Sequence, residues 1–411
     1  MTLIRRMKKK PFIILLSLAA LIIWGSGIYY GQYINEHYQS VSIQMKEDTV
    51  SEQKLMTALK YEEVKNSINI PHISAWNRLE EQTTTNKELG ISYKTQLIEV
   101  YGDIRQVYPM KLTKGNLLTP EDYEGCMVDQ EVAYKLFGTV DPVGNTITYK
   151  NKQYYIRGII KSPESVFFIR INDKKHTYNN IELVYEDKEN GQELANAFMT
   201  QNNLAGSYTV IDGSFYAGIL DRLYKVPAWF LGFYMLYQIL KVIWKRRTLP
   251  LQVFVLLLGF LSVWMVLKWL LEFQIYIPER FIPTKWSDFS FWIEKYKEFR
   301  KHIEQMEYLT PTIKDINFIG YAKRCIFYTL ISIAGMWIFA THIRFFLDKI
   351  DGFSLAVLAV ILECGAIFIL YKTGKIFLAC NGYLYMIPIF ILAEDLVNKG
   401  KSYIINKYPK L

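Results

Sequence analysis

Six apolar segments, each long enough to span a lipid bilayer as a helix, constrain this chain more than any other feature. They cover residues 11–30, 228–244, 249–273, 325–346, 353–371 and 376–393. An α-helix rises 1.5 Å per residue, so about 20 apolar residues cross a hydrocarbon core about 30 Å thick. The sequence therefore predicts a multi-pass protein of the cell membrane, with about six transmembrane helices.

The positive charges indicate which side of the membrane each connection occupies. Arg5, Arg6 and Lys8 precede the first segment, and further basic residues occupy the turn at 241–247 and the tail after residue 399. Short cytoplasmic connections carry an excess of lysine and arginine, so both ends of the chain are expected inside. The first segment is long and has no clear A-x-A cleavage site, which favours an uncleaved anchor over a signal peptide.

The stretch between the first two apolar segments has the mixed strand and helix patterns of one α+β domain. The expected fold class is thus an α-helical membrane bundle with an α+β extracytoplasmic domain inserted after the first helix. The predicted parts are a cytoplasmic basic tail and first transmembrane helix (1–30), the extracytoplasmic domain (31–225), transmembrane helices 2 and 3 (226–273), an extracytoplasmic loop (274–324), and transmembrane helices 4 to 6 with a basic cytoplasmic tail (325–411).

Residues 107–163 carry the most detailed local pattern. We expect a helix start at 119–122, a strand at 126–128 and a short helix at 130–137. Gly138 suits the position after that helix, where a left-handed residue caps the last carbonyls. The β-branched and aromatic stretches 146–149 and 154–160 flank a polar turn and predict a hairpin.

This pattern resembles the MacB-like periplasmic core domain of MacB/FtsX-type membrane proteins of ABC export systems. The resemblance rests mainly on Leu136-Phe137-Gly138, Asp141-Pro142-Val143-Gly144 and Gly158-Ile159-Ile160. It implies a permease-like subunit that pairs with an ABC ATP-binding subunit, and with a second permease. In that family the extracytoplasmic domain relays motion of the membrane helices to a substrate or partner outside.

Two features depart from that family. Its members usually carry a coupling segment after the second span, whereas the turn here, from Lys245 through Arg246 and Arg247 to Pro250, is too short to hold one. The six expected spans also exceed the four usual for this architecture. Lys245, Arg246 and Arg247 are nevertheless candidates for cytoplasmic coupling, alongside the inside turn 345–352 and the basic tail.

One acidic residue lies midway through an apolar segment. A carboxylate at the bilayer centre costs about 3 kcal/mol or more unless it is protonated, paired or facing water, so Glu363 should face other helices. It is either a polar contact for a proton or substrate, or a protonated group in an interhelical hydrogen bond. An intramembrane enzyme built on Glu363 and His342 is a further, less favoured alternative.

The predicted loop 274–324 contains an amphipathic helix at 288–308. Trp292, Tyr296, Phe299, Ile303 and Met306 recur at helical spacing on one face. Such a helix lies on the membrane surface, packs onto its own protein, or holds a partner helix.

Motifs for catalysis and for cofactors do not occur in the sequence. It contains no G-x-x-x-x-G-K-[ST] phosphate loop, H-E-x-x-H, G-x-S-x-G or C-x-x-C motif, so we expect neither an enzyme nor a bound metal or cofactor. The net charge of +9 lies beside apolar segments, which favours a role in membrane topology over nucleic-acid binding.

The leading hypothesis is a permease-like subunit of an ABC-type export or envelope-remodelling system. The alternative is a non-transporting membrane scaffold or sensor with a ligand- or partner-binding ectodomain.

Overall fold

The computed structural model describes residues 9–46, 48–187, 190–204, 206–245, 250–271, 282–283, 285, 288–308, 312–347, 350–375 and 382–407. The chain divides into two compact units. Unit 1 comprises Met1–Asn35, Ile219–Ile277 and Ile319–Leu411, and unit 2 comprises Glu36–Gly218 and Pro278–Phe318. Three helices continue from one unit into the other: α2 (Lys9–His37), α7 (Gly213–Leu223) and α11 (Ile313–Leu347).

A mixed sheet forms the framework of unit 2. Its strands follow the order β12-β1-β11-β3-β4-β9-β6-β8-β5, and β7 pairs with β3 and β8. The pairs β4/β9 and β6/β8 are parallel and the others are antiparallel. The strands are β1 (Val41–Met45), β3 (His72–Asn86), β4 (Ile91–Tyr101), β5 (Lys111–Gly115), β6 (Gly125–Asp129), β7 (Thr146–Tyr149), β8 (Lys152–Lys161), β9 (Val166–Ile169), β11 (Asn180–Val184) and β12 (Tyr208–Asp212). A separate pair joins β2 (Val50–Ser51) to β10 (Thr177–Tyr178).

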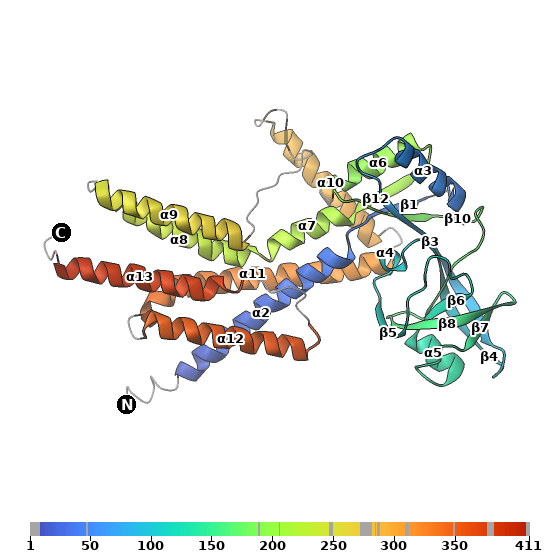
Figure 1. The fold of residues 1–411 in the computed structure, drawn as a ribbon, viewed down its shortest axis with the longest axis horizontal. Coiled ribbons are helices and arrows are strands. Elements are labelled where there is room, and N and C mark those ends of the chain that lie inside the picture. Colours follow the sequence, from blue (N-terminus) through green and yellow to red (C-terminus); the bar gives the residue numbers. More distant parts are fainter. Residues whose placement is uncertain are drawn as a thin grey trace. The chain divides into compact units, whose positions relative to one another are not determined.

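Four helices of unit 2 cover different parts of this sheet: α3 (Glu52–Val64), α4 (Ile104–Val107), α5 (Gln130–Phe137) and α6 (Gly191–Gln201). Helix α10 (Phe289–Tyr308) also belongs to unit 2. Figure 1 shows α3 and α6 near β1 and β12, and α5 beside β7 and β8. Residues of α3 and α6 share one apolar core with β1 and β11, and residues of α5 share a second core with β6, β7 and β8. A third core under α4 includes Trp76, Ile98 and Phe168.

Most of the expected elements of the 107–163 stretch are confirmed. Helix α5 spans the predicted residues, and Gly138 follows it with φ 70°. Asp129 accepts hydrogen bonds from the backbone N–H groups of Glu131 and Val132 at the start of α5, at 2.8 and 3.1 Å. The helix start expected at 119–122 is wrong, because this segment is a turn closed by the bond from Asp122 N–H to Thr119 O.

The longest strand, β3, is absent from the sequence-based expectations. Its second half is rich in glutamine, threonine and asparagine and lacks a clean alternation of apolar residues. A break in register between Leu79 and Gln82 interrupts the strand, and Glu80 and Glu81 lie within it. These two residues are exposed at this β-bulge.

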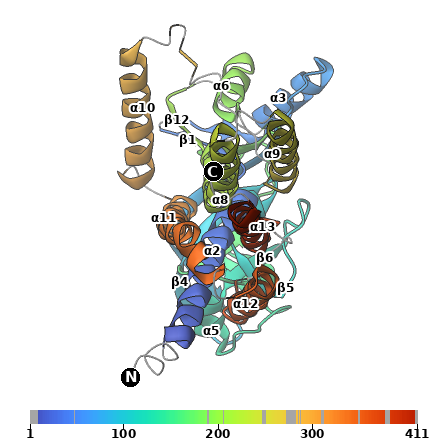
Figure 2. The same cartoon turned by 90° about the vertical axis from the view of Figure 1, so that its left-hand side faces the viewer.

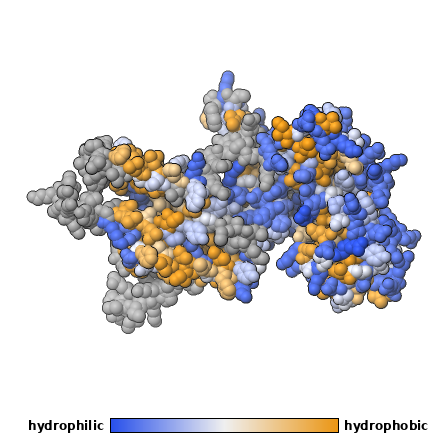
Figure 3. Space-filling model, in the orientation of Figure 1, coloured by the Kyte–Doolittle hydropathy of each residue, from blue (hydrophilic) through white to orange (hydrophobic). Residues whose placement is uncertain are grey.

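Unit 1 is helical over its described residues. Besides α2, α7 and α11 it contains α8 (Val226–Lys245), α9 (Pro250–Leu271), α12 (Gly352–Lys372) and α13 (Met386–Lys407). Helix α8 packs against α9 and α13, and α12 packs against α13, as Figure 2 shows nearly end-on. Trp24 of α2 donates its indole N–H to the carbonyl of Tyr224 at 3.1 Å. The coloured surface of these helices is largely apolar, as lipid contact requires, whereas the visible face of unit 2 is largely hydrophilic (Figure 3).

The number of membrane-spanning helices differs from the expected six. Among the described residues, three helices are long and apolar enough to cross a membrane: Val226–Trp244, Lys314–Ile343 and Gly352–Lys372. Helices α2 and α9 cover the first and third predicted segments, whereas α13 begins only at Met386 and covers just the end of the predicted 376–393; over their described residues, none of these three helices is long and apolar enough to cross a membrane. For α13 the reason is clear, because Glu394, Asp395 and Lys399 interrupt its apolar sequence. In α9 the apolar part that the structure describes is the shorter Leu256–Leu271.

Candidate functional site

Three helices that continue into unit 1 meet inside unit 2. Phe318, on the second turn of α11, lies 5.3 Å from the ring of Tyr38, which directly follows α2, and 6.3 Å from the ring of Tyr216 on α7. All three side chains are buried. Edge-on and tilted aromatic pairs at such distances are favourable beyond the area that they bury. We call Tyr38, Tyr216 and Phe318 the helix junction.

The beginning of α11 is fixed by a reciprocal cap. Thr312 N–H donates to Asp315 Oδ2 at 3.0 Å, and Asp315 N–H donates to Thr312 Oγ1 at 3.2 Å. This capping box satisfies two backbone N–H groups at the helix start. The cap fixes the direction of the first turn of α11, and Lys314, between the two capping residues, points into the interior of unit 2.

The Lys314 ammonium group makes three hydrogen bonds within unit 2. It donates to Glu182 Oε2 at 2.6 Å, to Ser40 Oγ at 2.6 Å and to the carbonyl of Gln106 at 2.9 Å. An ammonium group has three N–H donors, so these contacts satisfy all of them. The Lys314 side chain is 8% exposed and that of Glu182 is 2% exposed.

The Glu182 carboxylate, in turn, is surrounded by donors from neighbouring strands. Ser40 and Ser42 donate their hydroxyl groups to Glu182 Oε2 at 2.6 and 2.7 Å, and Trp76 Nε1 lies 3.5 Å from Oε1. Ser42 is the register partner of Glu182 across β1 and β11, so both side chains lie on the same face of the sheet. We call Lys314, Glu182, Ser40, Ser42 and Gln106 the Lys314 cluster.

Burial determines what this cluster can do. Removing two opposite charges from water costs several kcal/mol per ion, and only close contact with further hydrogen bonds compensates for that cost. Any movement that separates α11 from β1 and β11 would leave a buried charge unpaired. The cluster therefore favours movement of the first turn of α11 together with the sheet.

The sequence-predicted candidates belong to unit 1, whereas the Lys314 cluster belongs to unit 2. Glu363 lies in the middle of α12, is 4% exposed, and its Oε1 has no hydrogen-bond partner among the described residues. His342, on α11, is exposed, and its Nδ1 lies 3.0 Å from the carbonyl of Ile338. Lys245 is the last residue of α8, while Arg246 and Arg247 lie outside the described residues.

Sequence reasoning missed the Lys314 cluster, although weak signals for it exist. Glu182 stands between Ile181 and Leu183 in an otherwise apolar strand, a position where a charge needs a partner. Thr312 and Asp315 have the spacing of a capping box, which marks the start of α11 in the predicted outer loop. Neither signal identifies the partner, because Lys314 lies 132 positions after Glu182 in the chain.

Other polar groups of unit 2 form smaller contacts. His176 is partly buried, and its Nε2 lies 2.9 Å from Glu99 Oε2. Among the described residues, no group of three or more histidine, cysteine, aspartate or glutamate side chains could hold a metal ion.

Together, an apolar helical unit and an α+β unit joined by continuous helices define a membrane-anchored protein with a folded domain outside the lipid. Residues 13–200 match the family model of the MacB-like periplasmic core domain. This match confirms the resemblance seen in the sequence; it begins within α2 and continues through most of the α+β domain of unit 2.

Solved structures of related domains are also similar to part of the chain. The extracellular domain of the noncanonic ABC-type transporter YknZ from Gram-positive bacteria is 15% identical, with 42% of this chain and 99% of that chain covered and a TM-score of 0.34. The periplasmic region of MacB from Actinobacillus actinomycetemcomitans is 10% identical, with coverages of 45% and 94% and a TM-score of 0.36. A domain of a putative permease protein from Porphyromonas gingivalis is 12% identical, with coverages of 43% and 91% and a TM-score of 0.31. No curated protein matches the chain.

Proposed function

We propose that this chain is a permease-like subunit of an ABC-type export or envelope-remodelling system. Its α+β domain lies on the extracytoplasmic side of the cell membrane, and ATP is hydrolysed by a separate ABC subunit. The membrane helices transmit motion to the domain through α2, α7 and α11. The family match supports the broad class, and the Lys314 cluster carries the mechanical part of the proposal.

The connections from α2 and α7 to the sheet are short and therefore stiff. Three residues separate the end of α2 at His37 from the start of β1 at Val41, and α7 begins directly after β12. A short connection has few rotatable bonds, so a displacement of the helix moves the attached strand by nearly the same amount. The third helix, α11, follows a long excursion of the chain, and the buried pair of Lys314 and Glu182 supplies the link to the sheet.

Purification of the full chain from its native membrane in mild detergent tests the class. We expect an ABC ATPase with a phosphate-loop sequence to co-purify in a fixed ratio. The absence of any ATPase from an intact, folded preparation would contradict the proposal.

Substitution at the helix junction tests the transmission. Phe318→Ala removes the ring that contacts Tyr38 and Tyr216. In the complex with its ATPase, ATP and vanadate trap ADP and vanadate in the ATPase after one hydrolysis step. This trapping should change hydrogen exchange in β1 and β12, and Phe318→Ala should reduce that change without loss of the ATPase. Tyr134→Ala is the matched control, because Tyr134 is an exposed aromatic residue of α5 outside the junction. Equal responses of the two variants would exclude the junction as the route.

One observation favours a second function, a non-transporting scaffold or sensor whose ectodomain binds a ligand or partner. Helix α8 ends at Lys245 and α9 begins at Pro250, so four residues are available for contact with an ATPase there. Charge reversal at Lys245, Arg246 and Arg247 separates the two functions. It should abolish export if the turn touches an ATPase and should leave a sensor active, provided that labelling of both membrane sides shows an unchanged topology.

A further inference from the structure

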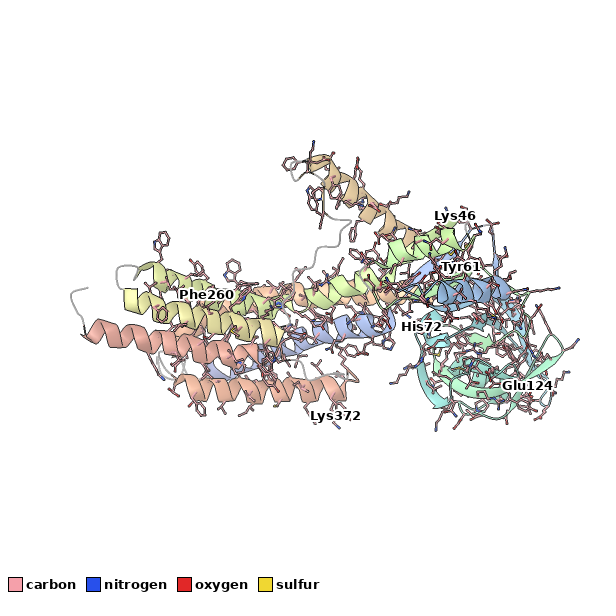
Figure 4. All side chains as sticks on the ribbon, turned by 45° about the horizontal axis from the view of Figure 1, so that its top comes forward. Lys46, Tyr61, His72, Glu124, Phe260 and Lys372 are labelled. Atoms are coloured by element: carbon pink, nitrogen blue, oxygen red, sulfur yellow. The ribbon has the colours of Figure 1, made fainter. Side chains whose placement is uncertain are left out.

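Helix α10 exposes an apolar face in its first half. Phe289 is 77% exposed, Trp292 40%, Ile293 56% and Tyr296 62%. Their spacing of three or four residues places them on one side of the helix. In Figure 4 the side chains of α10 stand out from the ribbon. Helix α10 spans the predicted residues, but the structure leaves most of this apolar face uncovered by the described residues.

The second half of α10 contacts the rest of unit 2. Phe299 lies 5.9 Å from the ring of Tyr216, a member of the helix junction. This contact attaches the second half of the helix to unit 2. The exposed face thus belongs to the end of α10 that follows α9 in the chain.

Charged residues flank the apolar face in an order typical of interfacial helices. Lys295 pairs with Glu298 at 2.8 Å, and Arg300 pairs with Glu304 at 3.1 Å. Lys297 and Lys301 are exposed on the side of the helix next to Ile293 and Arg300. Aromatic and aliphatic residues enter the headgroup region of a bilayer, while lysine and arginine beside them attract anionic lipids.

The position of α10 in the chain supports a lipid surface as the occupant of this face. It lies between the apolar helix α9 and α11, which is long and apolar enough to cross a membrane. The exposed first half of α10 begins at Phe289, with 17 residues between it and the end of α9 at Leu271, so the chain can bring this half to the surface of a bilayer that contains α9. A partner protein would have to compete with that lipid surface.

We propose that the first half of α10 lies in the headgroup region of the bilayer as an interfacial helix. Phe289, Trp292, Ile293 and Tyr296 face the acyl chains, and the basic residues beside them contact anionic headgroups. Such an arrangement ties the segment between α9 and α11 to the membrane surface. It does not depend on coupling to an ATPase and goes beyond the proposed function.

Spin labels on opposite faces of α10 test this inference in the full chain. One label replaces Tyr296 and the other replaces the exposed Glu294, two positions away and therefore on the far side of the helix. Both are introduced as Tyr296→Cys or Glu294→Cys into a chain with Cys364→Ser and Cys380→Ser. The buried Cys126 and Cys325 remain in the chain. A labelling ratio of one spin label per chain shows that neither of these two cysteines has reacted and that the protein is folded.

The labelled chains are measured in nanodiscs of phosphatidylcholine with phosphatidylglycerol. We expect the ratio of oxygen collisions to aqueous nickel-complex collisions to be at least about threefold higher at position 296 than at 294, because oxygen concentrates in the acyl region. Equal ratios would place the face in water, and exclusion of both quenchers at 296 would show that protein covers it. Either result overturns the proposal. In nanodiscs of phosphatidylcholine alone, the difference in this ratio between positions 296 and 294 should become smaller. An unchanged difference would show that anionic headgroups do not contribute to binding of α10.

Discussion

The ammonium nitrogen of Lys314, on α11, lies 2.6 Å from the carboxylate of Glu182, on a strand of a sheet built from residues before position 213. The pair joins the first turn of α11 to β11, and its hydrogen bonds extend to β1 and α4. A helix with an apolar stretch of membrane-spanning length is thus anchored to the α+β domain by a charged contact shielded from water. Salt screens such a contact much less than a surface ion pair.

Loss of one charge of this pair should destabilise unit 2 strongly. Lys314→Met leaves the Glu182 carboxylate buried without its cation, and we expect a loss of about 3 to 5 kcal/mol in the free energy of unfolding. The thiol of Cys126, which is fully buried in β6, reports unfolding through its reaction with an alkylating reagent in a chain whose other three cysteines are serine.

The double variant Lys314→Met/Glu182→Gln is the control for this prediction. The amide of glutamine carries no charge and its oxygen still accepts from Ser40 and Ser42, so about half of the lost stability should return. If the single and double variants unfold at the same denaturant concentration, the charge pair does not determine the stability of the cluster.

Two glycines with left-handed backbone angles should differ sharply in their tolerance of alanine. Gly115 has φ 73°, and an added Cβ would overlap the carbonyl oxygen of Arg157. Gly138 has φ 70°, but an added Cβ would meet no atom within 4 Å. Gly138→Ala should therefore cost only the left-handed strain of about 1 to 2 kcal/mol, and Gly115→Ala should cost distinctly more. Denaturant unfolding of the two variants compares them, and equal losses would show that the Arg157 backbone moves away easily.

Asp129 should make unit 2 less stable as the pH rises from about 4 to about 6. Burial is the main cause that raises the pKa of Asp129 from 3.8 to about 6, despite the backbone N–H groups that it caps. Between these two pKa values the native state binds the proton more readily than the unfolded chain, so stability decreases until the group is ionised in both states. The expected loss is about 1 to 3 kcal/mol.

Asp129→Asn should remove this part of the pH dependence, because asparagine keeps an oxygen that can cap α5 but does not titrate. Unfolding at pH 4.5 and 7.5, compared between the native chain and the variant, measures the difference. An identical slope in both chains would mean that Asp129 is not the group responsible.

Glu363→Gln should leave the membrane unit as stable as it is or make it more stable. Glu363 is buried in the middle of α12, and an ionised carboxylate at that depth costs about 3 kcal/mol or more. Glutamine keeps the size and the hydrogen-bonding capacity without a charge to bury. Thermal unfolding in detergent, with Glu363→Leu as the apolar comparison, measures the effect. A large loss on Glu363→Gln alone would indicate a specific role for the ionised group.

Local patterns in the sequence were sufficient for much of the fold. The limits of α5, its cap at Gly138 and the hairpin of β7 and β8 follow from spacing, turn residues and β propensity, which act over a few residues. The polar half of β3 escaped detection because its place in the sheet depends on pairing with β4 and β7, not on its own apolar residues. The family match agrees with the resemblance read from the same 107–163 stretch.

The sequence by itself determined that the chain has helices of membrane-spanning length and a MacB-like α+β domain, since apolar length and short motifs are properties of contiguous residues. Only the tertiary structure decided that Phe318 meets Tyr38 and Tyr216, and that Lys314 meets Glu182. These partners are far apart in the chain. A buried charge in the sequence indicates that some partner is needed, but the path of the whole backbone selects which one it is.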